Sequence, residues 1–264
     1  MGIHSTAVVD RLAEIHSDAD IGPFVTIDGP VQIGARTRVL PYAHLSGQTQ
    51  IGVDNVIHMG AVVGHVPQDL AYSGAETFLR IGDRNVIREY AQIHRGTQPG
   101  SSTVIGDDNY FMNLAHVGHN CSIGNGIIIV NGVMLGGHVE VGDLAFVSGN
   151  SVVHQHVRIG KLAFLRGLTK TSRDVPPFCV MDGTHTLRAI NRVGLRRAGY
   201  GLEQIRALQA AFRRLFYRRR NLRLALGELE AEACGPEVRE LIDFIRASKR
   251  GVCFGPKDSV TADE

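Results

Sequence analysis

The sequence predicts a mainly β protein in which a parallel β-helix of hexapeptide repeats is followed by a small α-helical C-terminal domain. The main observation is that a large apolar residue recurs at every sixth position from Ile3 to Leu165, except at Asp69, Ala75 and Pro99. A period of six fits neither the 3.6 of an α-helix nor the alternation of a plain strand. It indicates a solenoid whose stacked coils bury these apolar residues as continuous ladders.

The β-helix is expected over residues 1–185, with three hexads closing each coil. Each hexad supplies one short strand and one corner, and glycine often follows the apolar residue, as small residues do at crowded corners. Two stretches, near 64–80 and 96–103, keep the phase of the repeat but lose its chemistry. We interpret them as loop excursions from the solenoid, where functional residues commonly lie.

The regular repeat ends after Leu165, and the segment Asp174-Val175-Pro176-Pro177 is interpreted as the end of the coil stack. Apolar residues then recur at steps of three and four, beginning in the stretch 202–215, which predicts helices. An α-helical domain is therefore expected over 186–254. The remaining residues, 255–264, are expected to be a disordered tail.

Composition narrows the classes of partner. The 28 lysines and arginines nearly balance the 26 acidic residues, so the net charge of +2 gives no general reason to expect nucleic acid. The basic residues between positions 188 and 223 are nonetheless clustered. We interpret the cluster either as a local docking surface or as a solvated helix face. The cluster includes Arg192, Arg196, Arg197, Arg206, Arg213, Arg214, Arg218, Arg219 and Arg220.

The four cysteines have no metal-ligand spacing, and a chain of 264 residues does not need disulfides to be stable. No apolar run approaches the roughly 20 residues that span a bilayer, and the N-terminus has no export signal. We therefore expect a cytoplasmic protein with no stable membrane insertion and no bound metal.

Histidines gather on the second run of coils, where residues eighteen apart lie on successive rungs. Gly137 is expected directly over His119, with His138 beside it, and the next step reaches Gln155, which neighbours His154. An imidazole can accept a proton from a hydroxyl, and the N–H of a glycine can donate to an oxyanion, so the pair suits acyl transfer. Alternatively, each histidine is a polar residue on an exposed face.

Several segments together resemble the UDP-N-acetylglucosamine O-acyltransferases of lipid A biosynthesis over nearly the whole chain. The segments are Gln68-Asp69-Leu70, Ile93-His94-Arg95-Gly96-Thr97, the stretch from Asn113 to Cys121, Val153-His154-Gln155, Asp174-Val175-Pro176-Pro177 and Gly194-Leu195-Arg196-Arg197. The resemblance implies a left-handed β-helix. It also implies a homotrimer with its sites in clefts between neighbouring solenoids.

The same resemblance implies the reaction and the roles of individual residues. His119 would be the general base for the 3-hydroxyl of UDP-N-acetylglucosamine, which attacks a 3-hydroxyacyl thioester in the first step of lipid A biosynthesis. The acyl chain would be carried on the phosphopantetheine of acyl carrier protein, with no other cofactor. Gly137 would stabilise the oxyanion, and Asp69 is assigned to the catalytic set. Substrate-positioning roles fall on Gln68, His116, His138, His154 and Gln155, and nucleotide binding on Asn191 and Arg197.

The acyl chain is expected to end near Phe164, Gly167 and His185. Because glycine at 167 leaves room, we expect a medium-to-long chain, although this glycine could equally serve a tight corner.

Some positions depart from the commoner family pattern: Ala71, Val193 and Ala198 replace charged residues, and Asn120 replaces an aspartate after the base. Asparagine can accept a hydrogen bond from imidazole but cannot stabilise imidazolium by charge.

Other functions share parts of this pattern. An N-acyltransferase acting on an amino-sugar nucleotide, and coenzyme A as the donor, both stay open. A zinc enzyme of the γ-carbonic-anhydrase type would need three ligands around one point, and the histidines do not have that family's spacing. A non-catalytic scaffold would bind partners through the solenoid and the arginine-rich helices.

Overall fold

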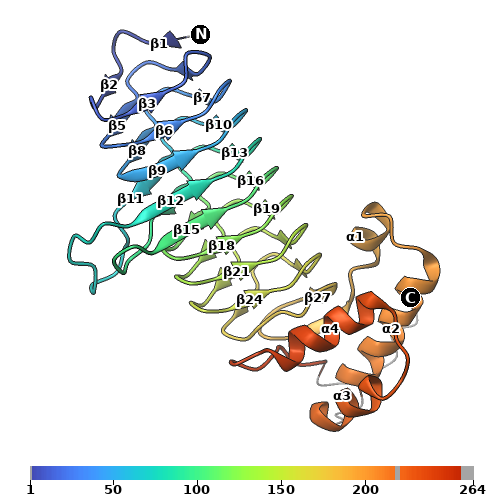
Figure 1. The fold of residues 1–264 in the computed structure, drawn as a ribbon. Helices are drawn as coiled ribbons and strands as arrows, with labels where there is room; N and C mark the ends of the chain where they lie inside the picture. The colour runs from blue at the N-terminus through green and yellow to red at the C-terminus, as the bar shows by residue number, and fades with distance from the viewer. Residues whose placement is uncertain (1, 218–220, 257–264) are drawn as a thin grey trace.

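The computed structural model describes residues 2–217 and 221–256 and confirms the expected parallel β-helix with a helical C-terminal region. Within that part of the chain, short strands stack into three parallel sheets, and the helices pack at the end of the solenoid remote from the N-terminus (Figure 1). Successive strands pass from sheet A to sheet B to sheet C, so the coil has a triangular cross-section with one sheet on each side.

The strands are two to four residues long and follow one another at regular intervals. Sheet A contains β1 (Gly2–Ile3), β4 (Asp20–Ile21), β7 (Arg38–Val39), β10 (Val56–Ile57), β13 (Val86–Ile87), β16 (Tyr110–Phe111), β19 (Ile128–Ile129), β22 (Phe146–Val147), β25 (Phe164–Leu165), β27 (Cys179–Met181) and β28 (Leu187–Ile190). Sheet B contains β2 (Val8–Val9), β5 (Thr26–Asp28), β8 (His44–Ser46), β11 (Val62–His65), β14 (Gln92–His94), β17 (His116–Val117), β20 (Met134–Leu135), β23 (Val152–Val153) and β26 (Lys170–Thr171). Sheet C contains β3 (Glu14–Ile15), β6 (Gln32–Ile33), β9 (Gln48–Ile51), β12 (Phe78–Ile81), β15 (Ser102–Ile105), β18 (Ser122–Ile123), β21 (Glu140–Val141) and β24 (Arg158–Ile159).

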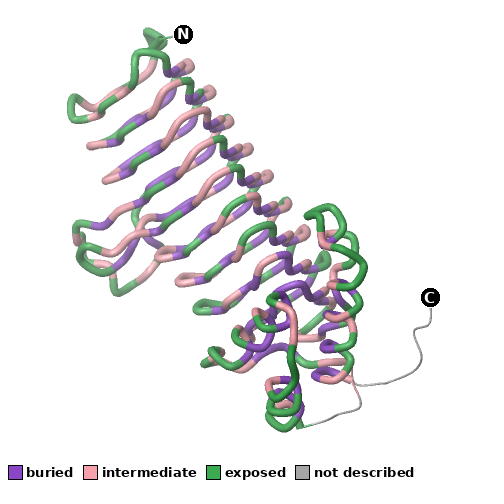
Figure 2. The backbone as a smooth tube through the Cα atoms, turned by 45° about the vertical axis from the view of Figure 1, so that its right-hand side comes forward, coloured by how far each residue is buried: buried purple, intermediate pink, exposed green. Residues whose placement is uncertain are grey.

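The hexad residues form the core of the solenoid. Each pairs with its equivalent on the next rung, as Val117 does with Leu135 and Ile129 does with Val147, both eighteen positions further on. From Ile21 to Leu165 the large apolar hexad residues are at most 4% exposed, and Figure 2 shows buried and exposed segments alternating along the coils after the first. Ile3, on the first rung, is 53% exposed because no coil lies beneath it.

The two loop excursions keep the phase because each inserts whole hexads. Ile81 pairs with Ile51, thirty positions earlier, so the first loop adds two hexads to a coil of eighteen. Phe111 pairs with Ile87, twenty-four positions earlier, so the second loop adds one hexad. The coil register is therefore the same above and below the loops, both of which leave the solenoid between sheet B and sheet C (Figure 1).

The stack does not end at Asp174, which corrects the expectation for that segment. After the two prolines, β27 pairs with β25 in parallel through Phe164 and Val180, sixteen positions apart, and β28 then pairs with β27 antiparallel. The period of six fails there because the last coil is shorter by two residues. The antiparallel strand is what closes sheet A.

Helices follow β28. They are α1 (Arg192–Arg197), α2 (Leu202–Phe216), α3 (Leu222–Glu230) and α4 (Pro236–Arg246). Asn191 and Asn221 cap α1 and α3, and Pro236 occupies the first turn of α4. The short helix α1 was not predicted from the sequence, because six residues cannot show a helical period. Helix α2 contacts β28, α3 and α4, and so joins the helices to the solenoid.

The end of the chain returns to the solenoid. Val252 forms a bridge with Asp174, and Phe254 forms one with Thr186. Asp174 is buried, and its carboxylate accepts the N–H of Arg158 at 2.9 Å and the hydroxyl of Ser248 at 2.7 Å. Of the predicted tail, residues 257–264 lie outside the described part of the chain.

We predict that Ile129→Ala destabilises the protein far more than Ile128→Ala. The two isoleucines are neighbours on β19, but Ile129 is fully buried in the core ladder and Ile128 lies on the outer face. Removing the buried side chain should cost about 2–5 kcal/mol through lost burial and a cavity. Thermal unfolding of both variants measures this, and equal losses would contradict the assigned faces of the strand.

Candidate functional site

Three separate segments meet at the corner between sheets B and C. His119 lies in the corner between β17 and β18, Asp69 in the loop between β11 and β12, and Thr97 in the loop between β14 and β15. The loops leave the same edge of the solenoid on the rungs before His119. Residues fifty positions apart in the sequence are thus brought together around one imidazole.

His119 and Gly137 are stacked as the eighteen-residue coil predicts. A Cβ atom placed on Gly137 would lie 2.5 Å from Nε2 of His119, so the imidazole occupies the space that a side chain would need. Among the described residues, the N–H of Gly137 has no hydrogen-bond partner. The His119 side chain is 13% exposed. A partly desolvated base and an unpaired peptide donor therefore face the same space.

Polar groups contact both nitrogens of the His119 ring. Nδ1 lies 2.9 Å from Oδ1 of Asn120, and Nε2 lies 3.5 Å from Oδ2 of Asp69. The ring of His138 meets that of His119 edge-on with 5.1 Å between centroids, and His138 itself stacks on His156 at 4.4 Å. The expected neighbour His138 is thus in place, and His156 extends the histidine column by one rung.

His116 lies on β17, three residues before His119 on the same coil. Burial, followed by the nearby His94 and His119, lowers the pKa of His116 to about 4. Its ring is 5.1 Å from that of His94, which is 4% exposed and whose Nδ1 lies 2.8 Å from the carbonyl oxygen of Val66. His94 belongs to the motif Ile93-His94-Arg95-Gly96-Thr97, but the spacing of residues did not indicate that it lies in the site. Its place in the column required knowing that the second loop adds one hexad.

His154 and Gln155 lie one rung above Gly136 and Gly137, and both side chains are exposed. Arg250, from the returning end of the chain, contacts this rung. Its Nη1 donates to the carbonyl oxygen of Gln155 at 2.7 Å, and its Nη2 lies 3.3 Å from Nδ1 of His154. Nothing in the local sequence around Arg250 indicated these contacts, which join residues 95 and 96 positions apart.

Gln68 is exposed on the first loop, next to the partly buried Asp69. The loop is held to the solenoid by Arg95, which donates to the carbonyl oxygen of Gly64 at 2.8 Å and to the hydroxyl of Tyr72 at 3.0 Å. These bonds hold the Asp69 region from the rung above. Ala71, one of the departures from the family pattern, is exposed and donates its N–H to Asp69 Oδ1 at 2.9 Å.

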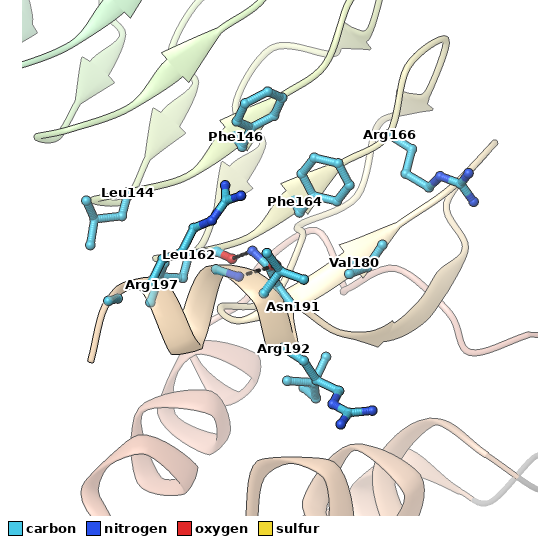
Figure 3. A pocket seen from close by; sticks show the side chains of 13 residues that line it. Leu144, Phe146, Leu162, Phe164, Arg166, Val180, Asn191, Arg192 and Arg197 are labelled. Atoms are coloured by element: carbon cyan, nitrogen blue, oxygen red, sulfur yellow. Dashed lines mark hydrogen bonds between the residues drawn. The ribbon is translucent and has the colours of Figure 1, made fainter. Parts of the chain in front are cut away.

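A second concave region, a groove of about 750 Å³, lies over sheet A beside α1 (Figure 3). Apolar side chains line it, and polar groups stand at its rim. The apolar residues include Leu144, Phe146, Leu162, Phe164 and Val180, and the polar ones Arg166, Asn191, Arg192 and Arg197. Figure 3 shows Arg197 extending from α1 toward the strands, whereas Arg192 points away from them.

Asn191 is committed to the start of α1. Its Oδ1 accepts the N–H of Gly194 at 2.9 Å, and its Nδ2 donates to the carbonyl oxygen of Leu162 at 2.9 Å. These bonds place α1 over the groove. They leave only the second Nδ2 hydrogen and the second Oδ1 lone pair of Asn191 available to a ligand. Val193 and Ala198, two further departures, line the same groove.

The three residues expected near the acyl end do not converge within one chain. Phe164 lines the groove on sheet A, and its ring is 5.3 Å from that of Phe146. Gly167 is at the next corner, where an added Cβ would be 3.5 Å from the carbonyl oxygen of Gly149. His185 contacts Thr171 on sheet B at 3.1 Å instead.

The arginine cluster is partly used inside the helical domain. Arg214 forms an ion pair with Glu232 at 2.7 Å, while Arg192, Arg196 and Arg197 are exposed. Arg218, Arg219 and Arg220 lie outside the described residues.

In residues 2–217 and 221–256, no helix is long and apolar enough to cross a membrane, and no cluster of histidine, cysteine or acidic side chains could hold a metal ion. The four cysteines are free.

Comparison with known proteins identifies relatives over nearly the full length. The family model described as UDP-N-acetylglucosamine O-acyltransferase, domain 2, matches residues 174–253, and a model of bacterial transferase hexapeptide repeats matches 102–137. Two curated proteins named acyl-[acyl-carrier-protein]–UDP-N-acetylglucosamine O-acyltransferase are similar to the chain. The Thermodesulfovibrio yellowstonii protein is 41% identical, over 95% of this chain and 98% of its own. The Syntrophobacter fumaroxidans protein is 42% identical, over 96% and 99%.

Among solved structures, the UDP-N-acetylglucosamine acyltransferase of Francisella novicida superposes with a TM-score of 0.92 at 35% identity, covering 97% of this chain and 95% of that one. The hand of the coil agrees with these structures, so the expected left-handed β-helix is confirmed.

We predict that His116 stays uncharged well below neutral pH. Because the pKa of His116 is lowered from 6.5 to about 4, its imidazole is protonated in the unfolded chain but not in the folded chain between pH 6.5 and about 4. The stabilisation is complete above pH 6.5 and is lost as the pH falls toward 4, by up to about 3 kcal/mol. NMR titration of the histidine ring protons measures this directly, and a His116 midpoint near 6.5 would refute the assignment.

Proposed function

This chain belongs to the family of UDP-N-acetylglucosamine O-acyltransferases, and from that premise we propose how its own residues carry out the reaction. The enzyme transfers an acyl group from acyl carrier protein to UDP-N-acetylglucosamine in lipid A biosynthesis. We propose that the acceptor is the 3-hydroxyl, that the acyl group is a 3-hydroxyacyl chain, and that His119 is the general base. The observation that supports this most is the imidazole of His119 packed directly against Gly137.

In the proposed first step, Nε2 of His119 takes the proton of the sugar hydroxyl as its oxygen attacks the thioester carbonyl. Imidazole suits this role because its ordinary pKa lies near neutral pH, so it can accept the proton and later return it. The tetrahedral intermediate then collapses, the carbon–sulfur bond breaks, and the imidazolium returns the proton to the departing thiolate of the phosphopantetheine. His119 thus ends in its starting state.

Gly137 is proposed to stabilise the negative charge on the carbonyl oxygen. Its N–H is unpaired within the described residues and lies beside the base, so groups on two successive rungs can contact the attacking oxygen and the oxyanion. A preorganised donor of this kind stabilises the transition state more than the ground state. Because a base and a peptide donor suffice, the proposed mechanism uses no cofactor other than the donor's own phosphopantetheine.

We propose that substrate binding requires two chains. His119 lies at the corner where sheets B and C meet, whereas the groove with Arg197 lies over sheet A, the opposite side of the triangular coil. One ligand cannot contact both regions of the same chain. A closed homotrimer, in which a groove on one solenoid faces a corner of the next, resolves this.

Within that assembly, Arg197 and Asn191 are proposed to bind the nucleotide, because guanidinium groups donate paired hydrogen bonds to a diphosphate. Asp69, Gln68, His116, His138, His154 and Gln155 are proposed to position sugar and donor at the corner. Phe164 and Gly167, with His185 contributed across the interface, are proposed to limit the acyl chain. The exposed arginines near α1 offer a surface complementary to an acidic carrier protein.

We predict that Gly137→Ala lowers kcat by at least about a hundredfold. The new methyl group would displace the imidazole of His119 from its position, and small misplacements of a base have effects of this size. The assay incubates the enzyme with UDP-N-acetylglucosamine and a series of acyl carrier protein thioesters and identifies products by mass.

The matched control is Gly227→Ala on α3, where an added Cβ meets no atom within 4 Å. It should keep full activity and gain about 0.5–1 kcal/mol of helix stability. A Gly137→Ala enzyme with the parent kcat would contradict the assigned pair. A parent enzyme that forms no product with any acyl chain would contradict the function itself.

We predict that inactive variants of the two regions restore each other. Mixed trimers of His119→Ala and Arg197→Ala should recover about one quarter of the parent activity, since a random mixture supplies both intact residues at that fraction of shared sites. Sedimentation of the parent should give three times the 28.7 kDa chain mass. No recovery in verified mixed trimers would show that each site is built from one chain.

A further inference from the structure

We propose that two residues share the control of His119, with Asn120 fixing its tautomer and Asp69 supplying the negative charge that stabilises the imidazolium. The inference rests on the proposed role of His119 as the general base. It assigns Asn120 as a positioning residue that acts through His119. It also explains how this chain can carry an amide where a carboxylate commonly follows the base.

The tautomer follows from the hydrogen bonds of Asn120. Its Oδ1 accepts the backbone N–H of Thr97 at 3.0 Å, and because a peptide N–H can only donate, the atom there must be the amide oxygen. The same oxygen lies 2.9 Å from Nδ1 of His119. Two acceptors cannot bond to each other, so Nδ1 carries the hydrogen. Nε2 therefore holds the lone pair and is ready to accept a proton.

Asn120 is itself held rigidly. Its N–H donates to Oγ1 of Thr103 at 2.8 Å, and Thr103 is fully buried on strand β15 of sheet C. Its φ of +60° is that of a corner residue, a conformation that asparagine tolerates better than most residues. The second loop therefore orients the imidazole through Thr97, without any catalytic side chain of its own.

Asp69 faces the opposite nitrogen. Its Oδ1 accepts the N–H of Ala71 at 2.9 Å, which leaves Oδ2 directed at Nε2 of His119, 3.5 Å away. While Nε2 holds a lone pair, these two acceptors make no hydrogen bond. Once Nε2 is protonated, the carboxylate attracts the imidazolium. The interaction is therefore stronger in the transition state than in the ground state, as catalysis requires.

The other titratable groups around His119 do not supply this charge. His138 packs against the ring. His116, on the same coil as His119, and His94, on the coil before, act on it electrostatically. Burial lowers the pKa of all three, which keeps them neutral. Among the described residues, Asp69 is the carboxylate that contacts the ring.

The test moves the charge from one side of the ring to the other. In Asn120→Asp the new carboxylate can still accept from Thr97 and Nδ1, so the acid limb of the kcat/KM profile should move up by roughly one pH unit. In Asp69→Asn it should move down by a similar amount, and kcat/KM at neutral pH should fall about tenfold. The double variant should return the limb to near its parent position.

The control is Asn150→Asp, an asparagine in the same corner conformation, with φ of +55°, on a different edge of the solenoid. Its profile should match the parent. Single variants whose acid limb stays at the parent pH would overturn the charge assignment. A parent enzyme without activity would instead count against the proposed function, so the two failures are distinguishable.

The tautomer is tested without activity. In protein labelled with 15N histidine, His119 should show a protonated Nδ1 and an unprotonated Nε2 at neutral pH, and Asn120→Ala should give a mixture of tautomers. An Nε2–H tautomer in the parent protein would overturn the role of Asn120. Thermal unfolding of Asn120→Ala separates this outcome from loss of the fold.

Discussion

The register of one coil on the next is the constraint on which the rest of the structure depends. Each hexad residue stacks on its equivalent eighteen positions away, because a shift by one residue would turn every apolar side chain out of the core. The ladders bury the large apolar residues almost completely from the second coil onward. That register is also what brings His119 against Gly137, so the core and the proposed chemistry share one cause.

Loops are tolerated in this architecture only if they respect the register. The insertions before Ile81 and before Phe111 have lengths of whole hexads, so the ladder continues above them without a slip. Both leave at the edge where His119 lies. The first loop thereby brings Asp69 to Nε2 of the His119 imidazole, and the second brings Thr97 to the Asn120 oxygen that contacts Nδ1. Loops of arbitrary length would not reproduce this placement.

The triangular section of the solenoid separates functions in space. The corner between sheets B and C carries the histidines, and the outer face of sheet A carries the apolar groove with Arg197. The helical domain contributes to both regions, since α1 covers the groove and Arg250 contacts the rung of His154. If each site is shared between two chains, oligomerisation is part of catalysis. The loss of charge at Asn120, by contrast, is compensated within one chain, because Asp69 lies at the same corner.

The sequence by itself determined the solenoid, its interior residues and the His119–Gly137 pair, because a fixed period converts spacing directly into position. It also indicated the helices after Gly201, which have regular apolar faces. Only the tertiary structure decided that the stack continues past Pro177, that His185 lies away from Phe164, and that Arg250 reaches His154. These contacts arise where the period is broken, and there the spacing of residues along the chain no longer specifies their separation in space.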